Sequence, residues 1–351
     1  MREEANCQGN STQNQIQKTL KSKHILGIDI AKKSFSYRLE SEAGEQLEAG
    51  SWPNHRAEIE RFIRHLMAQI GDLKALHAGM EATGRYGSDV FVALHEAGAW
   101  VSVINPAQVK YFAASLNRRG KNDSMDAALI ARYVRERHPR ATLPLDAASA
   151  RLKELVGEID NLVAESVRIG NRLQEVGGAC QEVAASLSRR KKLIAAEMVR
   201  LEKAVLELVH SQPLMASQHR LLCTIKGIGA RTAARLLAHL AGKAFHSARQ
   251  LAAYAGLTPR ENTSGTSLKG KTRLCKQGNS RLRRSLYLPA LVLWRHCPEV
   301  KLWADAIARR TQSKKSALGA VMRKLAHIVF GVLKHHRSFN PSLLSTPVPH
   351  A

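Results

Sequence analysis

Four acidic residues stand where they could share one chemical task. Asp29 follows an apolar run, residues 25–28, and a charge beside such a run is costly unless it is paired or bound to a cation. Glu81 ends a second strand-like run, and Asp123 and Asp126 lie three apart, on one face of a helical pattern. Clustered carboxylates suit Mg²⁺ or Mn²⁺. The simpler alternative for Asp123 is helix capping.

The charge balance points to a polyanionic partner. The 351 residues contain 54 Lys and Arg against 29 Asp and Glu, a net charge of +25. Nucleic acid is the expected partner of so basic a chain, and two metal ions about 3.5–4 Å apart can clamp a phosphodiester. The sequence contains no run close to the ~18 apolar residues that span a bilayer. Five scattered cysteines without a CxxC pair, and a polar N-terminus, predict a protein of the reducing cytoplasm.

Residues 24–146 predict an α/β domain of the ribonuclease H-like (RuvC-like) type. The expected order is β-β-β-α-β-α-β-α, with strands at residues 24–31, 34–40, 45–54, 74–81 and 99–106 and with last helices at about 107–115 and 124–137. In that fold the first and fourth strands are neighbours, and the last helix packs over their ends. The four acids would then meet at one edge of the sheet, while a doubly wound sheet is the second choice.

Residues 147–212 predict a helical hairpin or coiled coil. Apolar residues recur at three-to-four spacing up to Val176, Gly177 and Gly178 interrupt them, and a second series begins at Leu193. The basic run 188–192 is expected to be a solvated turn between the helices, with nucleic-acid contact as the alternative. The pattern favours self-association, and a plain helical linker is the alternative.

Residues 213–336 predict a mostly helical C-terminal domain. Two helices joined by the sequence from Lys226 to Gly229 resemble a helix-hairpin-helix unit, in which Gly227 and Gly229 allow close approach to a phosphate. Lys226 and Arg231 favour that interpretation over a tight turn between two helices. The polar segment 1–23 and the proline-rich tail 337–351 are expected to be disordered.

A basic stretch follows this unit and supplies the leading candidates for nucleic-acid contact. These are Lys269, Lys271, Arg273, Lys276, Arg281, Arg283 and Arg284. Such side chains neutralise phosphates, so binding should fall steeply with salt and carry little sequence information.

The chain resembles a known family along residues 25–334. The segments are GIDIAKKSF, MEATGRYG, INPAQVKYFAASLNRRGKNDSMDAALIARY, GIGARTAARLLAHL and YAGLTPRENTSGTSLKGKTRLCKQGNSRLRRSLY, in that order. They look like the DEDD transposases of bacterial insertion sequences, relatives of the Piv-type DNA invertases and described as bridge-RNA-guided serine recombinases.

The resemblance implies a transposase that cuts and rejoins DNA strands in the bacterial cytoplasm, at the nucleoid. The family's metal-binding tetrad falls on Asp29, Glu81, Asp123 and Asp126. Asn122 stands where the family usually has threonine, a mild departure that leaves the metal ligands intact. The resemblance further implies a dimer or tetramer, and a structured guide RNA that pairs with donor and target DNA.

The family's serine nucleophile falls on Ser264, before Gly265. Chemistry alone leaves Thr263, Thr266 and Ser267 as rival hydroxyls, because each would need a base or metal for activation. Two other functions stay open. A metal-dependent nuclease like the Holliday-junction resolvases would need the acids without Ser264, and a non-enzymatic nucleic-acid-binding protein would need neither.

Overall fold

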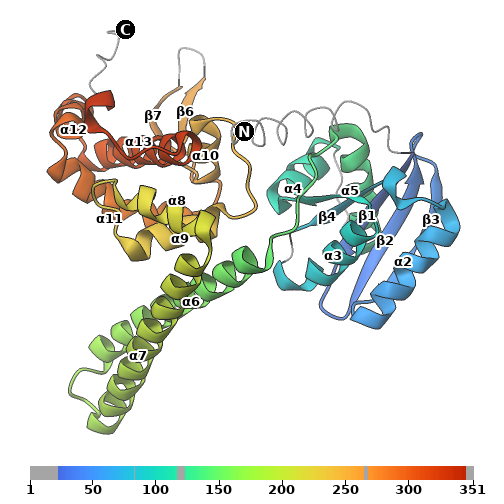
Figure 1. The fold of residues 1–351 in the computed structure, drawn as a ribbon, viewed down its shortest axis with the longest axis horizontal. Helices are drawn as coiled ribbons and strands as arrows, with labels where there is room; N and C mark the ends of the chain where they lie inside the picture. Colours follow the sequence, from blue (N-terminus) through green and yellow to red (C-terminus); the bar gives the residue numbers. More distant parts are fainter. Residues whose placement is uncertain (1–22, 83, 117–122, 265–267, 345–351) are drawn as a thin grey trace. The chain divides into compact units, whose positions relative to one another are not determined.

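The computed structural model describes residues 23–82, 84–116, 123–264 and 268–344. The chain divides into two compact units, Met1–Pro144 and Leu145–Ala351, and each is described by itself (Figure 1). The N-terminal segment 1–22 and the last residues, 345–351, for which disorder is expected, lie outside the described residues.

The N-terminal unit is built on a five-stranded mixed sheet. Its strands are β1 (His24–Ile30), β2 (Ser34–Ser41), β3 (Gln46–Pro53), β4 (Leu76–Glu81) and β5 (Trp100–Ile104). They lie in the order β3-β2-β1-β4-β5, with antiparallel pairing from β1 to β3 and parallel pairing of β4 with β1 and β5. The α/β class of this unit is confirmed, and β1 and β4 are neighbours, as the sequence predicts.

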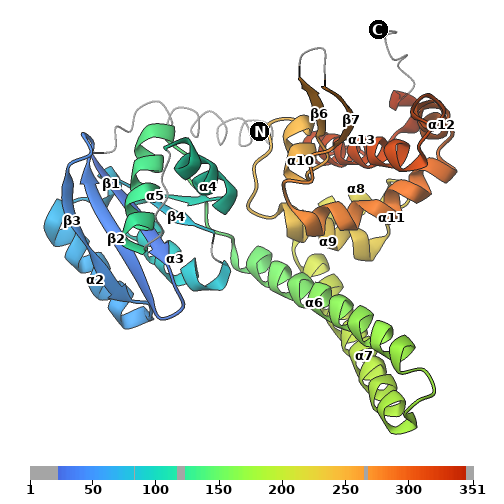
Figure 2. The ribbon, with the colours of Figure 1, turned by 180° about the vertical axis from the view of Figure 1, so that it is seen from behind.

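Helices cover both faces of this sheet (Figure 2). They are α2 (Arg56–Ile70), α3 (Ser88–Glu96), α4 (Pro106–Ser115) and α5 (Asp123–Arg137), with short 3-10 turns η1 (Leu73–Ala75) and η2 (Gly84–Gly87). Helices α2 and α3 share a core with Leu26, Ile28 and Met80. Helices α4 and α5 share a second core with Ile25 and Ile104. Strand β1 therefore sends alternate side chains to opposite cores.

A buried histidine makes this unit sensitive to acid. The His77 ring lies 2.9 Å from the Ser102 hydroxyl, which donates to the carbonyl oxygens of Pro139 and Arg140. Burial, and then the charge of His138, lowers the pKa of His77 to about 4. In the unfolded chain His77 therefore takes up a proton near pH 6.5, whereas in the folded chain it takes up that proton only near pH 4.

We expect stability to be constant above pH 6.5 and to fall as the pH drops from there towards 4. The loss between pH 7 and pH 5 should be about 2 kcal/mol from this residue. Urea unfolding followed by tryptophan fluorescence measures it, because the Trp100 ring lies 6.2 Å from the His77 ring. His77→Gln should shrink the pH dependence; an unchanged slope in that variant would assign the acid sensitivity to other groups.

The C-terminal unit is mostly helical, as predicted. It comprises α6 (Ala147–Val176), α7 (Gln181–Ser211), α8 (Pro213–Cys223), α9 (Ala230–Leu240), α10 (Ala248–Tyr254), β6 (Pro259–Ser264), β7 (Leu268–Leu274), α11 (Ser280–His296), α12 (Pro298–Thr311), α13 (Lys314–His335) and η3 (Pro341–Leu344). Its main core joins the inner parts of α6 and α7 to the helices that follow. The long hairpin, predicted as a separate domain, thus shares a core with the C-terminal helices.

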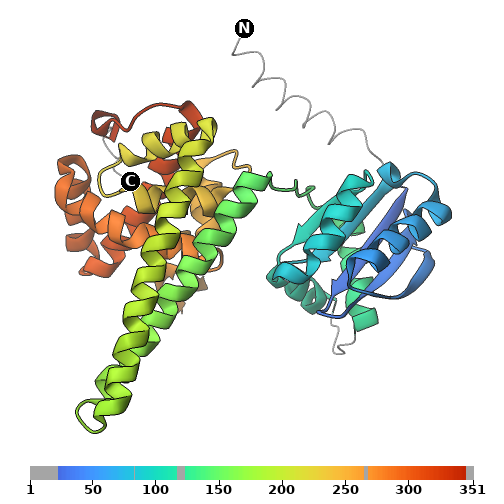
Figure 3. The same ribbon diagram turned by 60° about the horizontal axis from the view of Figure 1, so that its bottom comes forward.

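The outer part of the hairpin has a small core of its own. Ile169, Leu187 and Ile194 form this cluster between α6 and α7, and the two helices lie side by side beyond the helices that follow them (Figure 3). The basic run 188–192 lies inside α7, whereas the chain turns at 177–180. The prediction of a basic turn at 188–192 was wrong. Alanine, leucine and the long cationic side chains are good helix formers, so α7 continues through the run, and only the glycine pair breaks the helix.

Two further segments differ from the sequence prediction. Residues 259–264 and 268–274, part of the basic stretch for which the sequence predicts no strand, pair as the antiparallel strands β6 and β7. Residues 337–344 of the tail, expected to be disordered, are ordered, and the Phe339 amide donates to the Thr224 hydroxyl at 2.8 Å. Phe339 and Leu344 pack on the main core of the unit, and this apolar contact accounts for their order.

Helix α13 is the one helix in the described ranges that is long and apolar enough to cross a membrane. Of its most apolar window, 56% is buried inside the protein. Val321, Leu325 and Val329 lie in the main core. Within this unit α13 packs as a central core helix.

Candidate active site

Two of the four acids occupy matching positions on adjacent parallel strands. Ile28 of β1 pairs with Met80 of β4, so Asp29 and Glu81 are the next residues along the two strands. Ile28 and Met80 face the core under α2 and α3. Because side chains alternate along a strand, Asp29 and Glu81 project from the opposite face, the one that α5 covers. Both side chains are half-buried.

Helix α5 runs across this face in a direction fixed by its contacts. A side chain at Gly27 would clash with the Ala127 carbonyl oxygen and the Ala131 backbone nitrogen, so the helix backbone lies directly on β1. Further along the helix, Arg135 forms an ion pair with the buried Glu40 of β2. The ladder pairs Glu40 with the beginning of β1. Helix α5 is therefore antiparallel to β1, and its first turn lies at the end of β1 that carries Asp29.

The other two acids lie on that first turn. Asp123 begins α5, and Asp126, which is half-buried, directly precedes the residue that packs on β1. The fold thus brings Asp29, Glu81 and the first turn of α5 to one edge of the sheet. The side chain of Asp123 lies outside the description. Among the side chains that the structure describes, no group of three acids, histidines or cysteines is arranged to hold a metal ion.

The chemistry of the donor set fits a hard divalent cation. The acids offer carboxylate oxygens only, and Mg²⁺ is commonly held by one or two carboxylates together with waters and substrate phosphates. The matched pair of Asp29 and Glu81 meets that requirement by itself. A glycine inside each of the two strands is a sequence feature that permits α5 to lie this close to the sheet. Gly79 of β4 lies opposite Gly27 of β1, and Val134 of α5 packs against it.

Ser264 is the last residue of β6 and pairs with Leu268 of β7. Leu274, at the other end of the hairpin, packs against Gly319 of α13 and so anchors the hairpin to the core. Ser264 lies about 17 Å from that anchor, at about 3.3 Å per residue. Of its rivals, Thr263 precedes Ser264 in β6 and pairs with Lys269, while Thr266 and Ser267 lie outside the described residues.

The predicted helix-hairpin-helix turn joins α8 to α9, and contacts within the protein occupy most of it. Gly227 has a left-handed φ of 92°, and a side chain there would lie 2.6 Å from the Pro289 carbonyl oxygen. Lys226 donates to the carbonyl of His296 at 3.1 Å. Gly229 faces open space before α9. Packing on α11 therefore suffices to explain Gly227.

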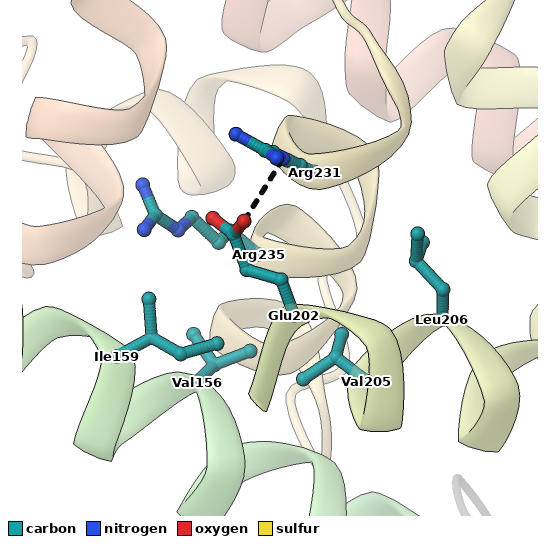
Figure 4. A pocket seen from close by; sticks show the side chains of 7 residues that line it. All are labelled: Val156, Ile159, Glu202, Val205, Leu206, Arg231 and Arg235. Atoms are coloured by element: carbon teal, nitrogen blue, oxygen red, sulfur yellow. Dashed lines mark ion pairs between the residues drawn. The ribbon is translucent and has the colours of Figure 1, made fainter. Parts of the chain in front are cut away.

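Arg231 of α9 also has an internal partner. Its guanidinium lies 3.0 Å from the Glu202 carboxylate of α7, across a small pocket (Figure 4). Arg235 lines the same pocket, one helical turn further on. The side chain of Arg231 is 69% exposed and can still reach a phosphate, but the Glu202 carboxylate balances part of its charge.

The cations of the basic stretch divide into two groups. Arg283 donates to the carbonyls of Ala255 and Lys276 and so ties two turns together, and Arg281 bonds Asn161 of α6. Arg273, Lys276 and Arg284 are exposed. The side chains of Lys269 and Lys271 lie outside the description. The sequence alone does not show which cations are structural, since that depends on contacts between distant segments.

Comparison with known proteins gives consistent results for both units. Residues 26–176 match the DEDD_Tnp_IS110 transposase model, and residues 219–304 match the model of the transposase IS116/IS110/IS902 family. The chain is 27% identical to the pilin gene-inverting protein of Moraxella bovis, over 91% of this chain and 98% of that protein. It is 25% identical to the transposase for insertion sequence element IS1111A of Coxiella burnetii, over 92% and 93% of the two chains.

Among solved structures, T. thermophilus RuvC in complex with a Holliday junction substrate matches part of the chain. The identity is 17% and the TM-score 0.25, over 31% of this chain and 89% of that one.

Proposed function

The chain belongs to the IS110 family of transposases and is a DNA transposase or recombinase, and we propose that it cuts and rejoins DNA strands with a divalent-metal site and a serine nucleophile. The metal ligands in this proposal are Asp29, Glu81, Asp123 and Asp126. The nucleophile is Ser264. The enzyme acts in the bacterial cytoplasm, on an insertion element and its target.

One observation carries the metal site. The matched ends of β1 and β4 and the first turn of α5 meet at one edge of the sheet, and three segments far apart in the chain contribute an acid there. A bound Mg²⁺ or Mn²⁺ would neutralise the carboxylates and the charge that develops on the phosphate. The glycines of β1 and β4 let α5 lie directly against the strands, and this supports a place for the first turn of α5, with Asp126, at the end of β1 that carries Asp29.

Ser264 performs the transfer itself. Its Oγ forms a bond to phosphorus while the bond from phosphorus to one deoxyribose oxygen breaks; the Ser264 proton passes to a base, and the leaving oxygen takes up a proton. The reverse step, with a different deoxyribose hydroxyl as nucleophile, releases Ser264 and rejoins the strand. The position of Ser264 supports this role, since it is the last residue of β6, five residues from the end of the hairpin that Leu274 anchors to the core.

The partners in this proposal follow from the resemblance and the charge. Cations such as Arg273, Lys276 and Arg284 hold phosphates and carry little sequence information. A structured guide RNA then selects donor and target DNA by base pairing. The enzyme acts as a dimer or tetramer, in which the acids of one subunit serve with Ser264 of another.

Metal removal tests the proposal directly. We expect strand exchange between two plasmids carrying element ends and target to stop in EDTA and to return with added Mg²⁺ or Mn²⁺. Fluorescence anisotropy with labelled DNA should show binding that is retained and at most modestly weaker in EDTA, because metal removal restores the negative charge of the carboxylates but leaves the basic side chains that neutralise phosphates in place. Full strand exchange in EDTA would contradict the metal site.

A further inference from the structure

The outer part of the α6–α7 hairpin carries a cluster of cations that the proposed function does not use. It consists of Arg168 and Arg172 on α6 and of Arg189, Arg190, Lys191 and Lys192 on α7, here called the basic band, and all six are exposed. The two segments lie side by side, because Arg190 pairs with Glu165 at 3.2 Å and the Lys191 amine lies 3.6 Å from the position of a Cβ on Gly170.

Charge is strongly segregated along this hairpin. Segments 165–172 and 187–194 hold six cations and one acid, whereas the rest of α6 and α7 holds four cations and eight acids. The net charge of the two helices is therefore small, yet six of their ten cations lie in one band with a single acid. A merely soluble surface would intersperse the two signs, as the remainder of the hairpin does.

The like charges of the basic band repel one another and destabilise the hairpin when no partner is bound. Arg168 and Arg172 are four apart, and Arg189 and Lys192 are three apart, so like charges face each other on each helix. Arg190 is the one member with an ion-pair partner among the described residues. An isologous contact between two bands would add further repulsion. A bound polyanion would relieve it.

We propose that the basic band binds the phosphodiester backbone of duplex DNA, in addition to the DNA contacts made by the proposed catalytic residues. The band spans about 12 Å of helix at 1.5 Å per residue, the length of three or four phosphates on one DNA strand. The band lies on the outer part of the hairpin, where α6 and α7 pack on each other (Figure 3), and its side chains are exposed. The inference rests on the DNA-binding part of the proposed function and on none of its catalytic residues.

Two matched double variants test the band. R189Q/K192Q removes two exposed cations from it, and R200Q/K203Q removes two exposed cations from the same helix outside it, where they pair with Glu197 and Glu207. Glutamine preserves helix propensity. Anisotropy with a fluorescein-labelled duplex of arbitrary sequence is measured over a range of NaCl concentrations. R189Q/K192Q should bind roughly tenfold more weakly and lower the salt slope by about 2, whereas R200Q/K203Q should stay within about twofold.

The other outcomes overturn the inference. Equal losses in both variants would mean a general charge effect, and wild-type affinity in R189Q/K192Q would mean that the band does not touch DNA. Lost affinity for an RNA hairpin with unchanged duplex binding would assign the band to RNA, and a smaller species in sedimentation with unchanged binding would assign it to self-association. A wild-type protein that does not bind DNA would instead sink the proposed function.

Folding is controlled within the same set. Circular dichroism should show unchanged helicity in R189Q/K192Q, and an equal or higher thermal midpoint, since like-charge repulsion is removed. R168Q/R172Q, on the other helix of the band, should reproduce the binding loss. Retained affinity in that variant would overturn the inference even if R189Q/K192Q were to unfold.

Discussion

Asp29→Asn is expected to lower the rate of strand exchange by roughly 10³-fold, since loss of a metal ligand removes several kcal/mol of charge stabilisation and each 1.36 kcal/mol is tenfold in rate. Asparagine has nearly the shape of aspartate, so β1 should keep its register between β2 and β4. DNA affinity should be unchanged or higher, because one negative charge is lost from a surface that faces phosphates. Plasmid recombination and anisotropy on the same preparation measure the two effects.

Asp72→Asn is the matched control for this variant. Asp72 is exposed in the same unit, just before β4, whereas Glu81 lies at the far end of that strand. Its side chain accepts a hydrogen bond from the Lys74 amide, and asparagine can do the same. We expect wild-type recombination from Asp72→Asn. Equal losses in both variants, or full activity in Asp29→Asn, would remove the acids from the mechanism and favour a non-enzymatic nucleic-acid-binding role.

The site edge could be predicted because its segments carry strong local signals. The apolar runs before Asp29 and Glu81 identify buried strands, and the pattern after Asp123 identifies a helix. Strand order and the placement of α5 then follow from one fold hypothesis. The sequence shows that residue 27 is glycine, but it does not show the contact of Gly27 with the Ala127 carbonyl oxygen, because that contact depends on how α5 crosses β1.

Other features depended on interactions that a linear pattern does not contain. The strands β6 and β7 are polar and lack the alternation of a half-buried strand, so the sequence indicates a basic stretch there and no strand. Arg283 and Arg231 resembled free phosphate ligands, yet the partners of their guanidinium groups come from distant segments. The basic run 188–192 resembled a turn, because composition shows charge but not whether a helix continues through it.

Ser264→Ala is expected to reduce recombination by roughly 10⁴-fold or more, the scale on which removal of a covalent nucleophile acts. The metal site and the cations stay intact, so DNA binding should remain at the wild-type level. With wild-type protein and labelled DNA, a denaturing gel should show a covalent protein–DNA adduct, and its tryptic peptide 261–269 should carry the nucleotide. The adduct should be missing in Ser264→Ala.

The controls for Ser264→Ala separate three mechanisms. Ser267→Ala, a change of the same kind in the same peptide, should recombine at the wild-type rate; if it alone fails, Ser267 is the nucleophile. Normal recombination in Ser264→Ala together with failure in Asp29→Asn would favour a metal-dependent nuclease of the resolvase type, in which water attacks phosphorus. Only a mechanism with a serine-linked intermediate requires both Ser264→Ala and Asp29→Asn to fail. In that mechanism the Ser264 hydroxyl attacks phosphorus, and the metal held by the acids stabilises the transition state of that attack.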